Sequence, residues 1–370
     1  METVQHRREF VELLLSVIRS DERLTYTEVK EILEDGNPET MARYRGLLDD
    51  LRTMEELAGR LTEKRRRRGS IDFDLPEPEI VLDLQGRPES IGRAERNLAH
   101  RIIEEFMLAA NEAVAAFLTE QELPCLYRVH EPPDPLKLKD FREFIKPLGL
   151  SFRMRGGAVA PTELQRLLVE VDGRPEEKMV NQVLLRCMKQ ARYDAENSGH
   201  FGLASSCYLH FTSPIRRYPD LVVHRLLDEY ARPVDGGRLA ALRAALPGIA
   251  RQSSERERIA AEAERTSVKV MQIEYMKRHI GDEFAGVISG VTDFGLFVEL
   301  HEILIDGLIR MRDLEDDYYL FDEKQYALRG RSRGRVYRLG DRVRVQVVAV
   351  DPERRSIDLA LVADEGRKFI

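Results

Sequence analysis

The chain has 370 residues, enough for two or three domains that each bury a core of their own. Hydrophobic residues make up 43% and charged residues 33%, and the formal net charge of −7 excludes a uniformly basic nucleic-acid coat protein but leaves local basic patches open. The sequence predicts neither a signal peptide nor a membrane-spanning helix, and Cys125, Cys187 and Cys207 lack metal-ligand spacing. We therefore expect a cytoplasmic protein with reduced thiols and no membrane contact.

The first 280 residues are predicted to be mainly helical. Apolar residues at helical spacing predict helices over five ranges: 7–20, 22–35, 44–61, 97–121 and 239–279. Alternating apolar residues within 70–88 predict two strands around a Pro-rich turn. Residues 124–135 are predicted to be a loop, and two helix-rich segments lead from there to residue 197. The basic run 64–68 is interpreted as a solvated helix end, with phosphate contact as the alternative.

After Gly281 the pattern changes abruptly. Short apolar strands are separated by Gly, Asp and Pro turns, which is typical of a small β-barrel. We therefore predict an α+β protein with a domain boundary near residue 280. The part before it is expected to combine helices with a mixed or antiparallel sheet, and the part after it is expected to be the barrel.

The predicted barrel carries an arginine-rich stretch and several aromatic residues. Seven arginines lie between residues 329 and 344 against one acid. Four of them occupy every second position, as on one face of a strand: Arg329, Arg331, Arg333 and Arg335. Phe284, Phe294 and Phe297 lie on or beside Gly-flanked strands. Cations for phosphates and rings for bases suit a single-stranded nucleic-acid groove, whereas the alternative is a phenylalanine core with a solvated arginine edge.

The stretch HFTSPIRRYPDLVVHR, residues 210–225, concentrates arginines and histidines beside hydroxyl groups, prolines and one acid. So many cations in sixteen residues indicate that an anion is held there. The alternative for Arg216 is an internal salt bridge with Asp220.

Several motifs resemble one known family. LTYTEV, IIEEFMLAAN, YRVHEPP and HFGLASSCYLHFTSPIRRYPDLVVHR resemble the catalytic domain of the ribonuclease R and ribonuclease II (RNB) exoribonucleases. GVISGVTDFGLFVEL, IDGLIRM and LGDRVRVQVVAVDPERRSIDLAL resemble the S1-type RNA-binding domain, an OB-fold barrel. GHFGL, HFTSPIRRYPDL and DDYYLFD make ribonuclease R the closer match. The resemblance implies that residues 1–279 are a C-terminal portion of the RNB catalytic domain and that residues 280–365 are an S1 domain.

The resemblance implies an activity and its catalytic arginine. The family degrades RNA from the 3′ end to nucleoside monophosphates with a divalent metal, expected to be Mg²⁺. Arg216 matches the family's catalytic arginine and would contact the scissile phosphate, for which a guanidinium offers a planar, permanently charged fork. Arg217 and Tyr218 are expected to support RNA binding beside it.

Further positions match substrate-binding residues of the family. Tyr26 and Glu104 are expected to read the ribose, because a carboxylate that accepts from the 2′-OH favours RNA over DNA. Phe73 is expected to stack on the 3′-terminal base. Taken singly, each has an ordinary structural alternative as a core-edge, helix-surface or strand residue. In the barrel, four residues are expected to contact RNA: Phe294, Phe297, Arg331 and Arg333.

The family's metal-binding aspartates, in a GxxRDIDDA-like segment, have no counterpart here. The acidic pairs Asp49/Asp50 and Asp316/Asp317 lack its spacing. We therefore expect no metal ligands in this chain and no activity from it alone. A split gene with a separately encoded N-terminal half, a truncated gene and a degenerate homologue all remain open. The predicted function is a 3′-to-5′ exoribonuclease, otherwise monomeric, that needs a complementing N-terminal part; the alternative is a non-catalytic single-stranded RNA-binding protein.

Overall fold

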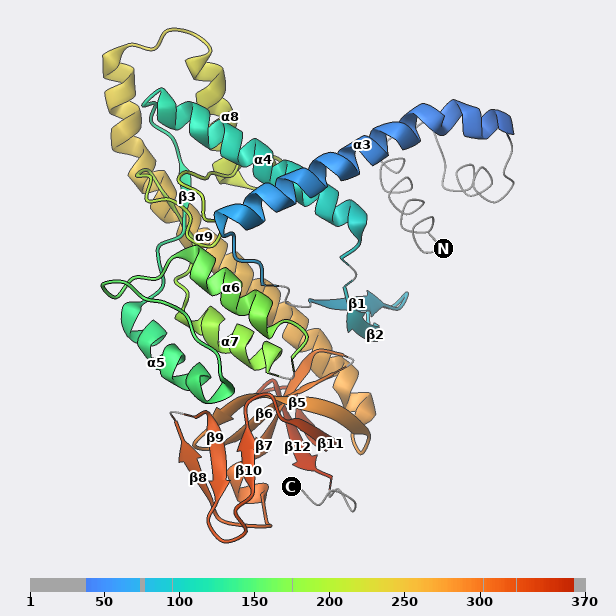
Figure 1. The fold of residues 1–370 in the computed structure, drawn as a ribbon. Coiled ribbons are helices and arrows are strands. Elements are labelled where there is room, and N and C mark those ends of the chain that lie inside the picture. Colours follow the sequence, from blue (N-terminus) through green and yellow to red (C-terminus); the bar gives the residue numbers. More distant parts are fainter. Residues whose placement is uncertain are drawn as a thin grey trace. The chain divides into compact units, whose positions relative to one another are not determined.

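The computed structural model describes residues 38–73, 77–94, 96–174, 176–301, 303–323 and 325–362, with side chains from residue 49 onward (Figure 1). The helices predicted over 7–20 and 22–35, and the candidate residue Tyr26, lie outside the described residues. Within the described ranges the chain forms two compact units that alternate along the sequence.

Unit 1 contains the described residues up to Ile71, together with residues 95–131 and 191–253. Its elements are α3 (Pro38–Arg68), α4 (Leu98–Glu120), β3 (Tyr127–Val129), β4 (Arg192–Asp194), α8 (Tyr218–Tyr230) and the first part of α9 (Gly236–Met276). Strands β3 and β4 pair antiparallel. Asn97 caps the N-terminus of α4: its side chain accepts a hydrogen bond from the backbone N–H of His100 at 3.2 Å, which satisfies an otherwise unpaired group.

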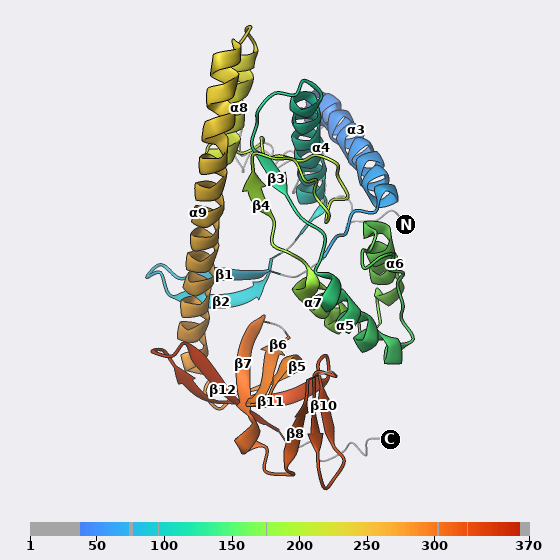
Figure 2. The same ribbon diagram turned by 90° about the vertical axis from the view of Figure 1, so that its left-hand side faces the viewer.

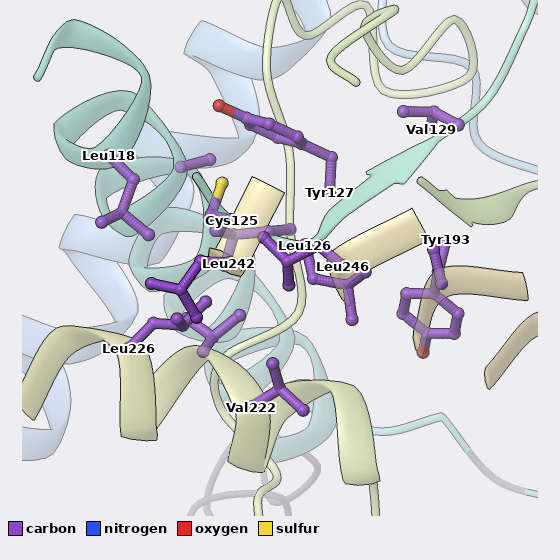
Figure 3. Close-up of a cluster of buried hydrophobic side chains, with 14 residues drawn as sticks. Leu118, Cys125, Leu126, Tyr127, Val129, Tyr193, Val222, Leu226, Leu242 and Leu246 are labelled. Atoms are coloured by element: carbon purple, nitrogen blue, oxygen red, sulfur yellow. The ribbon is translucent and has the colours of Figure 1, made fainter. Parts of the chain in front are cut away.

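The hydrophobic core of unit 1 lies where α4, β3, α8 and the first part of α9 meet (Figure 3). Leu118 of α4, Leu126 beside β3 and Val223 of α8 are at most 1% exposed, and Leu246 of α9 packs with them. Each fully buried side chain of this size stabilises the fold by about 1.5–3 kcal/mol. Leu209 belongs to the same core. The core therefore fixes the segment that leads into TSPIRRYPD.

Unit 2 contains residues 72–94 and 132–190 and the described residues from Ser254 onward. Its elements before the barrel are β1 (Pro78–Leu82), β2 (Pro88–Arg93), α5 (Pro135–Ile145), η1 (Lys146–Leu148), α6 (Pro161–Val171), α7 (Glu177–Cys187), the rest of α9 and η2 (Lys277–His279). Strands β1 and β2 form an antiparallel hairpin. In α6, Leu164, Leu167 and Val171 are fully buried at helical spacing, which explains why this segment folds as an amphipathic helix.

The second part of unit 2 is a closed five-stranded barrel with strand order β11–β12–β7–β6–β5 (Figure 2). Its strands are β5 (Glu283–Thr292), β6 (Gly295–Leu300), β7 (Ile305–Arg310), β11 (Arg342–Asp351) and β12 (Ser356–Leu361). Leu296, Val298 and Leu300 alternate along β6 and are fully buried, so one face of each strand fills the barrel. The barrel closes where Asp358 of β12 pairs in parallel with Leu308 of β7.

An insertion separates β7 from β11. It consists of η3 (Met311–Asp313), β8 (Tyr319–Asp322), β9 (Ala327–Gly330) and β10 (Val336–Arg338). The three strands form an antiparallel sheet in the order β10–β9–β8. We call residues 311–338 the insertion.

The predicted α+β class with a closed barrel is confirmed, and α3, α4 and α9 correspond to the helices predicted over 44–61, 97–121 and 239–279. Three local predictions differ from the structure. Residues 71–73 form no strand; the Ile71 N–H instead donates to the Gly202 carbonyl at 2.7 Å. Strand β2 was not expected, and β3 lies inside the predicted loop. None of the described helices combines the length and apolarity that a bilayer crossing needs.

Candidate functional site

The 212–220 loop, TSPIRRYPD, connects the core segment at Leu209 to α8. Asp220 in the first turn of α8 is completely buried, and its Oδ1 accepts hydrogen bonds from the Ser213 N–H and from Arg217 Nη2, each at 2.8 Å. The Ser213 carbonyl accepts from the backbone N–H groups of Arg216 at 3.3 Å and Arg217 at 3.0 Å. These bonds close the loop around a buried carboxylate and restrict its shape.

The side chain of Arg216 makes none of these hydrogen bonds. The internal salt bridge is formed by Arg217 and Asp220, so the alternative expectation of a bridge between Arg216 and Asp220 is wrong. Arg216 is exposed, and it has no ion-pair partner among the described residues. Its neighbour Ile215 is 97% exposed and Tyr218 is 53% exposed. The loop therefore presents a permanently charged guanidinium in an accessible position.

Histidine and tyrosine rings pack together beside this loop. Tyr193 Oη and His210 Nδ1 lie 2.9 Å apart in a hydrogen bond. The rings of Tyr208 and His210 meet edge to face at 5.7 Å, and His200 contacts Tyr208 in the same way at 5.3 Å. The Arg128 guanidinium lies 4.7 Å from the centre of the Tyr193 ring, within cation–π distance. The cluster packs buried aromatic rings against the positive charge of Arg128.

Two histidines of this cluster are held neutral. Burial lowers the pKa of His210 from 6.5 to about 3, and the nearby cations of Arg217 and Arg128 act in the same direction. Burial, with His130 and Arg128, lowers the pKa of His200 to about 3 as well. These two histidines therefore add no positive charge near the loop at neutral pH, whereas the arginines do.

Helices α4 and α8 both hold the segment that leads into the loop. Asn111 of α4 is 2% exposed; its Oδ1 accepts from the Phe211 N–H at 2.9 Å, and its Nδ2 donates to Tyr208 Oη at 2.9 Å. The Phe211 ring stacks on His224 of α8, with ring centres 4.2 Å apart. Because a buried amide left without partners costs about 1–3 kcal/mol, Asn111 fixes this segment strongly.

The basic run at the end of α3 is partly internal. Arg65 donates to Glu105 of α4 at 2.8 Å, and these side chains are only 12% and 8% exposed. Arg68 pairs with Glu112 of α4 and donates to the Leu203 carbonyl at 3.0 Å. The interpretation of this run as a solvated helix end is therefore wrong for Arg65 and Arg68, which join α3 to α4.

The candidate ribose-binding residue Glu104 lies next to the buried Glu105 on α4. Glu104 is half-buried, and its Oε2 accepts from Arg96 Nη2 at 2.6 Å. Its carboxylate is thus accessible but already ion-paired. The candidate stacking residue Phe73 is half-buried and belongs to unit 2, whereas Glu104 and Arg216 belong to unit 1.

Two candidate aromatic residues lie on the barrel surface in unit 2. Phe294, in the turn between β5 and β6, is 54% exposed. Phe297 on β6 is half-buried, and the two rings meet edge to face at 5.9 Å. The interpretation of Phe294 as a core residue is therefore wrong.

The arginine-rich stretch does not form one strand face. Arg329 ends up on β9, paired with Asp322, and Arg335 is paired with Asp316. Arg331 and Arg333 lie in the exposed turn between β9 and β10, and neither has an acidic partner among the described residues. Asp322 and Asp316 thus pair with two arginines of the predicted row, and Arg331 and Arg333 remain available.

The described residues contain no group of three or more His, Cys, Asp or Glu side chains that could hold a metal ion. Both acidic pairs noted in the sequence have other roles. Asp49 pairs with Arg52 on α3, and Asp317 accepts three backbone hydrogen bonds in the insertion. The described part of the chain therefore does not fit a divalent metal.

The residues that sequence reasoning missed are mostly buried polar groups. Asn111, Tyr208 and His210 support the 212–220 loop, and Glu105 rather than Glu104 is buried. One signal was available: Asn111 shares the buried face of α4 with Ile102, Ala115 and Leu118, where a polar side chain needs a partner.

Comparisons with known proteins agree with this geometry. The family model described as RNB domain matches residues 4–233, and the S1 RNA binding domain model matches residues 277–361. Ribonuclease R of Aquifex aeolicus is 46% identical over 349 residues, which cover 94% of this chain and 49% of that protein. Ribonuclease R of Thermotoga maritima is 43% identical over 354 residues, covering 95% and 49%.

Among solved structures, Mycoplasma genitalium RNase R in complex with ribose methylated single-stranded RNA is similar with a TM-score of 0.80 at 30% identity. That match covers 91% of this chain and 53% of the other. The chain thus spans about half the length of the curated relatives that it matches. The RNB match alone extends over more than half of the chain. The chain belongs to the RNB family, that of the ribonuclease R exoribonucleases, and contains an S1 RNA-binding domain.

Proposed function

We propose that this chain forms the RNA-binding part of a ribonuclease R-like 3′-to-5′ exoribonuclease. The proposed enzyme hydrolyses single-stranded or structured RNA to nucleoside monophosphates, and Arg216 contacts the scissile phosphate. One observation carries the proposal: Arg216 is exposed and without an acidic partner among the described residues, on a loop whose other arginine is neutralised by the buried Asp220.

The proposed role of Arg216 follows from the chemistry of phosphodiester hydrolysis. Negative charge builds on the non-bridging oxygens as the bond to the terminal nucleotide breaks, and a guanidinium fork donates paired N–H groups to them. Asp220 holds the loop before substrate binds, so little reorganisation is needed in the transition state. Arg217 is proposed to support the loop, and Tyr218 to contact the RNA.

Three residues are proposed to bind the 3′ end of the RNA. Glu104 accepts from the 2′-OH, either in place of Arg96 or beside it. Phe73 stacks on the terminal base, and Tyr26 contacts the ribose. In the barrel, RNA contacts are proposed for Phe294, Phe297, Arg331 and Arg333.

We propose that residues 1–279 are a C-terminal portion of the RNB catalytic domain and that residues 280–365 are the S1 domain. The metal of the complete active site is proposed to be Mg²⁺, with ligands supplied from outside the described residues. A separately encoded N-terminal half is a proposed partner where the gene is split, and the protein is otherwise a cytoplasmic monomer. A non-catalytic RNA-binding protein is the second candidate, because the described residues hold no metal-binding cluster.

The test is complementation. The chain is combined with the part of the Aquifex aeolicus relative that it does not match, and release of mononucleotides from a 3′-tailed RNA is followed with Mg²⁺ or EDTA. We expect no release from the chain alone and Mg²⁺-dependent release from the combination. Arg216→Ala should then reduce release by about 10²-fold or more, with RNA affinity largely kept, because the contact forms mainly in the transition state.

Arg216→Lys serves as the matched variant and should rescue little, since an ammonium cannot reproduce the fork. Full activity of Arg216→Ala would remove the catalytic role of this residue. RNA binding without any release from the combination would favour the non-catalytic candidate.

A further inference from the structure

A pocket in unit 2 lies where the insertion meets the barrel. Its volume is about 590 Å³, within the usual range for small-ligand pockets. Its lining includes Phe294 from the barrel, Arg310 at the end of β7, and Arg312, Asp317 and Tyr318 from the insertion.

Two rings line this pocket while keeping much of their surface in water. Phe294 is 54% exposed and Tyr318 is 65% exposed, although burial of either ring would be favourable. Both rings are held by their backbones. The Phe294 carbonyl accepts from the Met311 N–H at 2.8 Å, and the Tyr318 carbonyl accepts from the Arg331 N–H at 2.9 Å. Exposed rings on a fixed backbone suit the stacking of an unpaired base.

The charges around the pocket favour an anionic ligand. Arg310 is neutralised by a bidentate pair with Asp358 of β12, at 2.8 and 3.0 Å. Arg312 is 75% exposed, and its one ion-pair contact among the described residues is with the neighbouring Asp313 at 3.6 Å. Arg331 and Arg333, without acidic partners among the described residues, lie in the turn that is bonded to Tyr318.

Asp317, the acid of the insertion that lines the pocket, is occupied by hydrogen bonds from backbone N–H groups. Asp317 accepts hydrogen bonds from the N–H groups of Tyr318 at 2.7 Å, Ser332 at 2.9 Å and Arg333 at 2.6 Å, which lower its pKa. A Cβ at Gly330 would lie 2.6 Å from the Asp317 carboxylate, so this position favours glycine. Asp317 therefore holds the arginine-bearing turn against the residue that carries the exposed ring.

We propose that the insertion turns the S1 barrel surface into a pocket for one unpaired RNA nucleotide, in which Tyr318 is a second stacking ring beside Phe294. Arg312 and the turn residues Arg331 and Arg333 bind the flanking phosphates. This inference rests on the proposed RNA binding by the barrel and adds the insertion as part of the binding site. The excess of arginines over available acids disfavours a basic or apolar occupant. The exposed rings beside them favour RNA over an acidic peptide, because a single strand offers bases for the rings as well as phosphates for the cations.

The test uses the full chain and a series of short polyadenosine oligomers, each with 2-aminopurine at one position. We expect one position at which fluorescence is quenched on binding. Tyr318→Leu should abolish that quenching and weaken binding about tenfold, whereas Tyr318→Phe should keep both. Leu320→Ala is the matched control. Leu320 lies on β8, two residues after Tyr318, and is 54% exposed but does not line the pocket. This substitution should change neither the quenching nor the affinity.

The same measurements on the Arg216→Ala chain separate this inference from the proposed catalytic role, because Arg216 belongs to unit 1. The quenching should persist in that variant. If Tyr318→Leu leaves quenching and affinity unchanged while Phe294→Ser reduces them, the barrel binds RNA without the insertion and the inference fails. If the chain binds no oligomer at all, the proposed RNA binding fails with it.

Discussion

The 212–220 loop of unit 1 and the turn between β9 and β10 of unit 2 both present arginines to solvent, but they are held in different ways. The loop is closed around Asp220, which is completely buried. The turn is held by Asp317, a half-buried carboxylate that accepts hydrogen bonds from the backbone N–H groups of Ser332 and Arg333. Removing Asp220 therefore leaves part-buried groups without this acceptor, whereas water can replace much of what Asp317 provides.

The comparison also shows what makes an arginine available. In the loop, Asp220 neutralises Arg217 and leaves Arg216. In the stretch from residue 329 to 335, Asp322 and Asp316 neutralise the outer arginines and leave the inner two. In both places the arginines available to bind a phosphate are those that form no ion pair with an acid among the described residues.

The largest expected effect comes from Asp220→Ala. The change leaves the part-buried Ser213 N–H and Arg217 guanidinium without their acceptor, and we expect the free energy of unfolding to fall by about 3–4 kcal/mol. Asp220→Asn keeps an acceptor oxygen and should lose about half of that. Urea unfolding measures both values. Equal stability of Asp220→Ala and the unchanged chain would mean that the loop is not braced from inside.

A second effect tests whether unit 1 depends on buried ion pairs elsewhere. Glu105→Ala removes the buried acid with which Arg65 pairs at the α3–α4 contact, while the bond from Arg65 to Ser70 Oγ at 2.9 Å remains, and we expect a loss of about 2–3 kcal/mol in urea unfolding. The matched control is Glu63→Ala, which breaks the exposed pair with Arg67 and should cost less than about 0.5 kcal/mol. Similar losses in the two variants would contradict the distinction between buried and exposed pairs.

The next effect is a dependence of stability on pH. Because burial and the neighbouring arginines lower the pKa of His210 to about 3, the folded state stays neutral while the unfolded chain takes up a proton below pH 6.5. The free energy of unfolding should therefore fall as the pH falls from 6.5 towards 3, by about 1.4 kcal/mol per pH unit for each such histidine. His210→Gln should remove the contribution of one histidine, about 1.4 kcal/mol per pH unit, from this slope. Urea unfolding between pH 6.5 and 5 measures the slope. An unchanged slope would show that His210 is protonated in the folded state.

Much of the fold could be predicted because its signals are local. Helices α3, α4 and α9 have long periodic patterns, and the barrel strands have Gly, Asp and Pro turns between them. Strands β3 and β4 have only three residues each, so they carry too little periodicity to be recognised. The row of alternating arginines resembled a strand, but Gly334 has a φ of +69° and the chain turns there.

The site could be predicted only in part. Its motifs identified the loop and the family, but which arginine the buried acid neutralises depends on three-dimensional contacts. The pairs Arg65–Glu105 and Arg335–Asp316 join residues 40 and 19 positions apart, beyond any local pattern. Burial also separates Glu105 from its neighbour Glu104, although the two have the same chemistry in the sequence.

The smallest expected effect is a change in the salt dependence of RNA binding, which should distinguish Arg331 and Arg333 from the ion-paired Arg329. If Arg331 and Arg333 each contact a phosphate, the slope of log affinity against log salt should become shallower by about 0.7 for each arginine replaced by alanine. Arg329→Ala is the matched control, since that arginine is neutralised by Asp322 and should release no counterion. Titration of the full chain with a polyadenosine oligomer at several salt concentrations measures the slopes. A larger change for Arg329→Ala than for Arg331→Ala would mean that pairing with an acid does not decide which arginines bind RNA, and the parallel with Arg216 and Arg217 would fail with it.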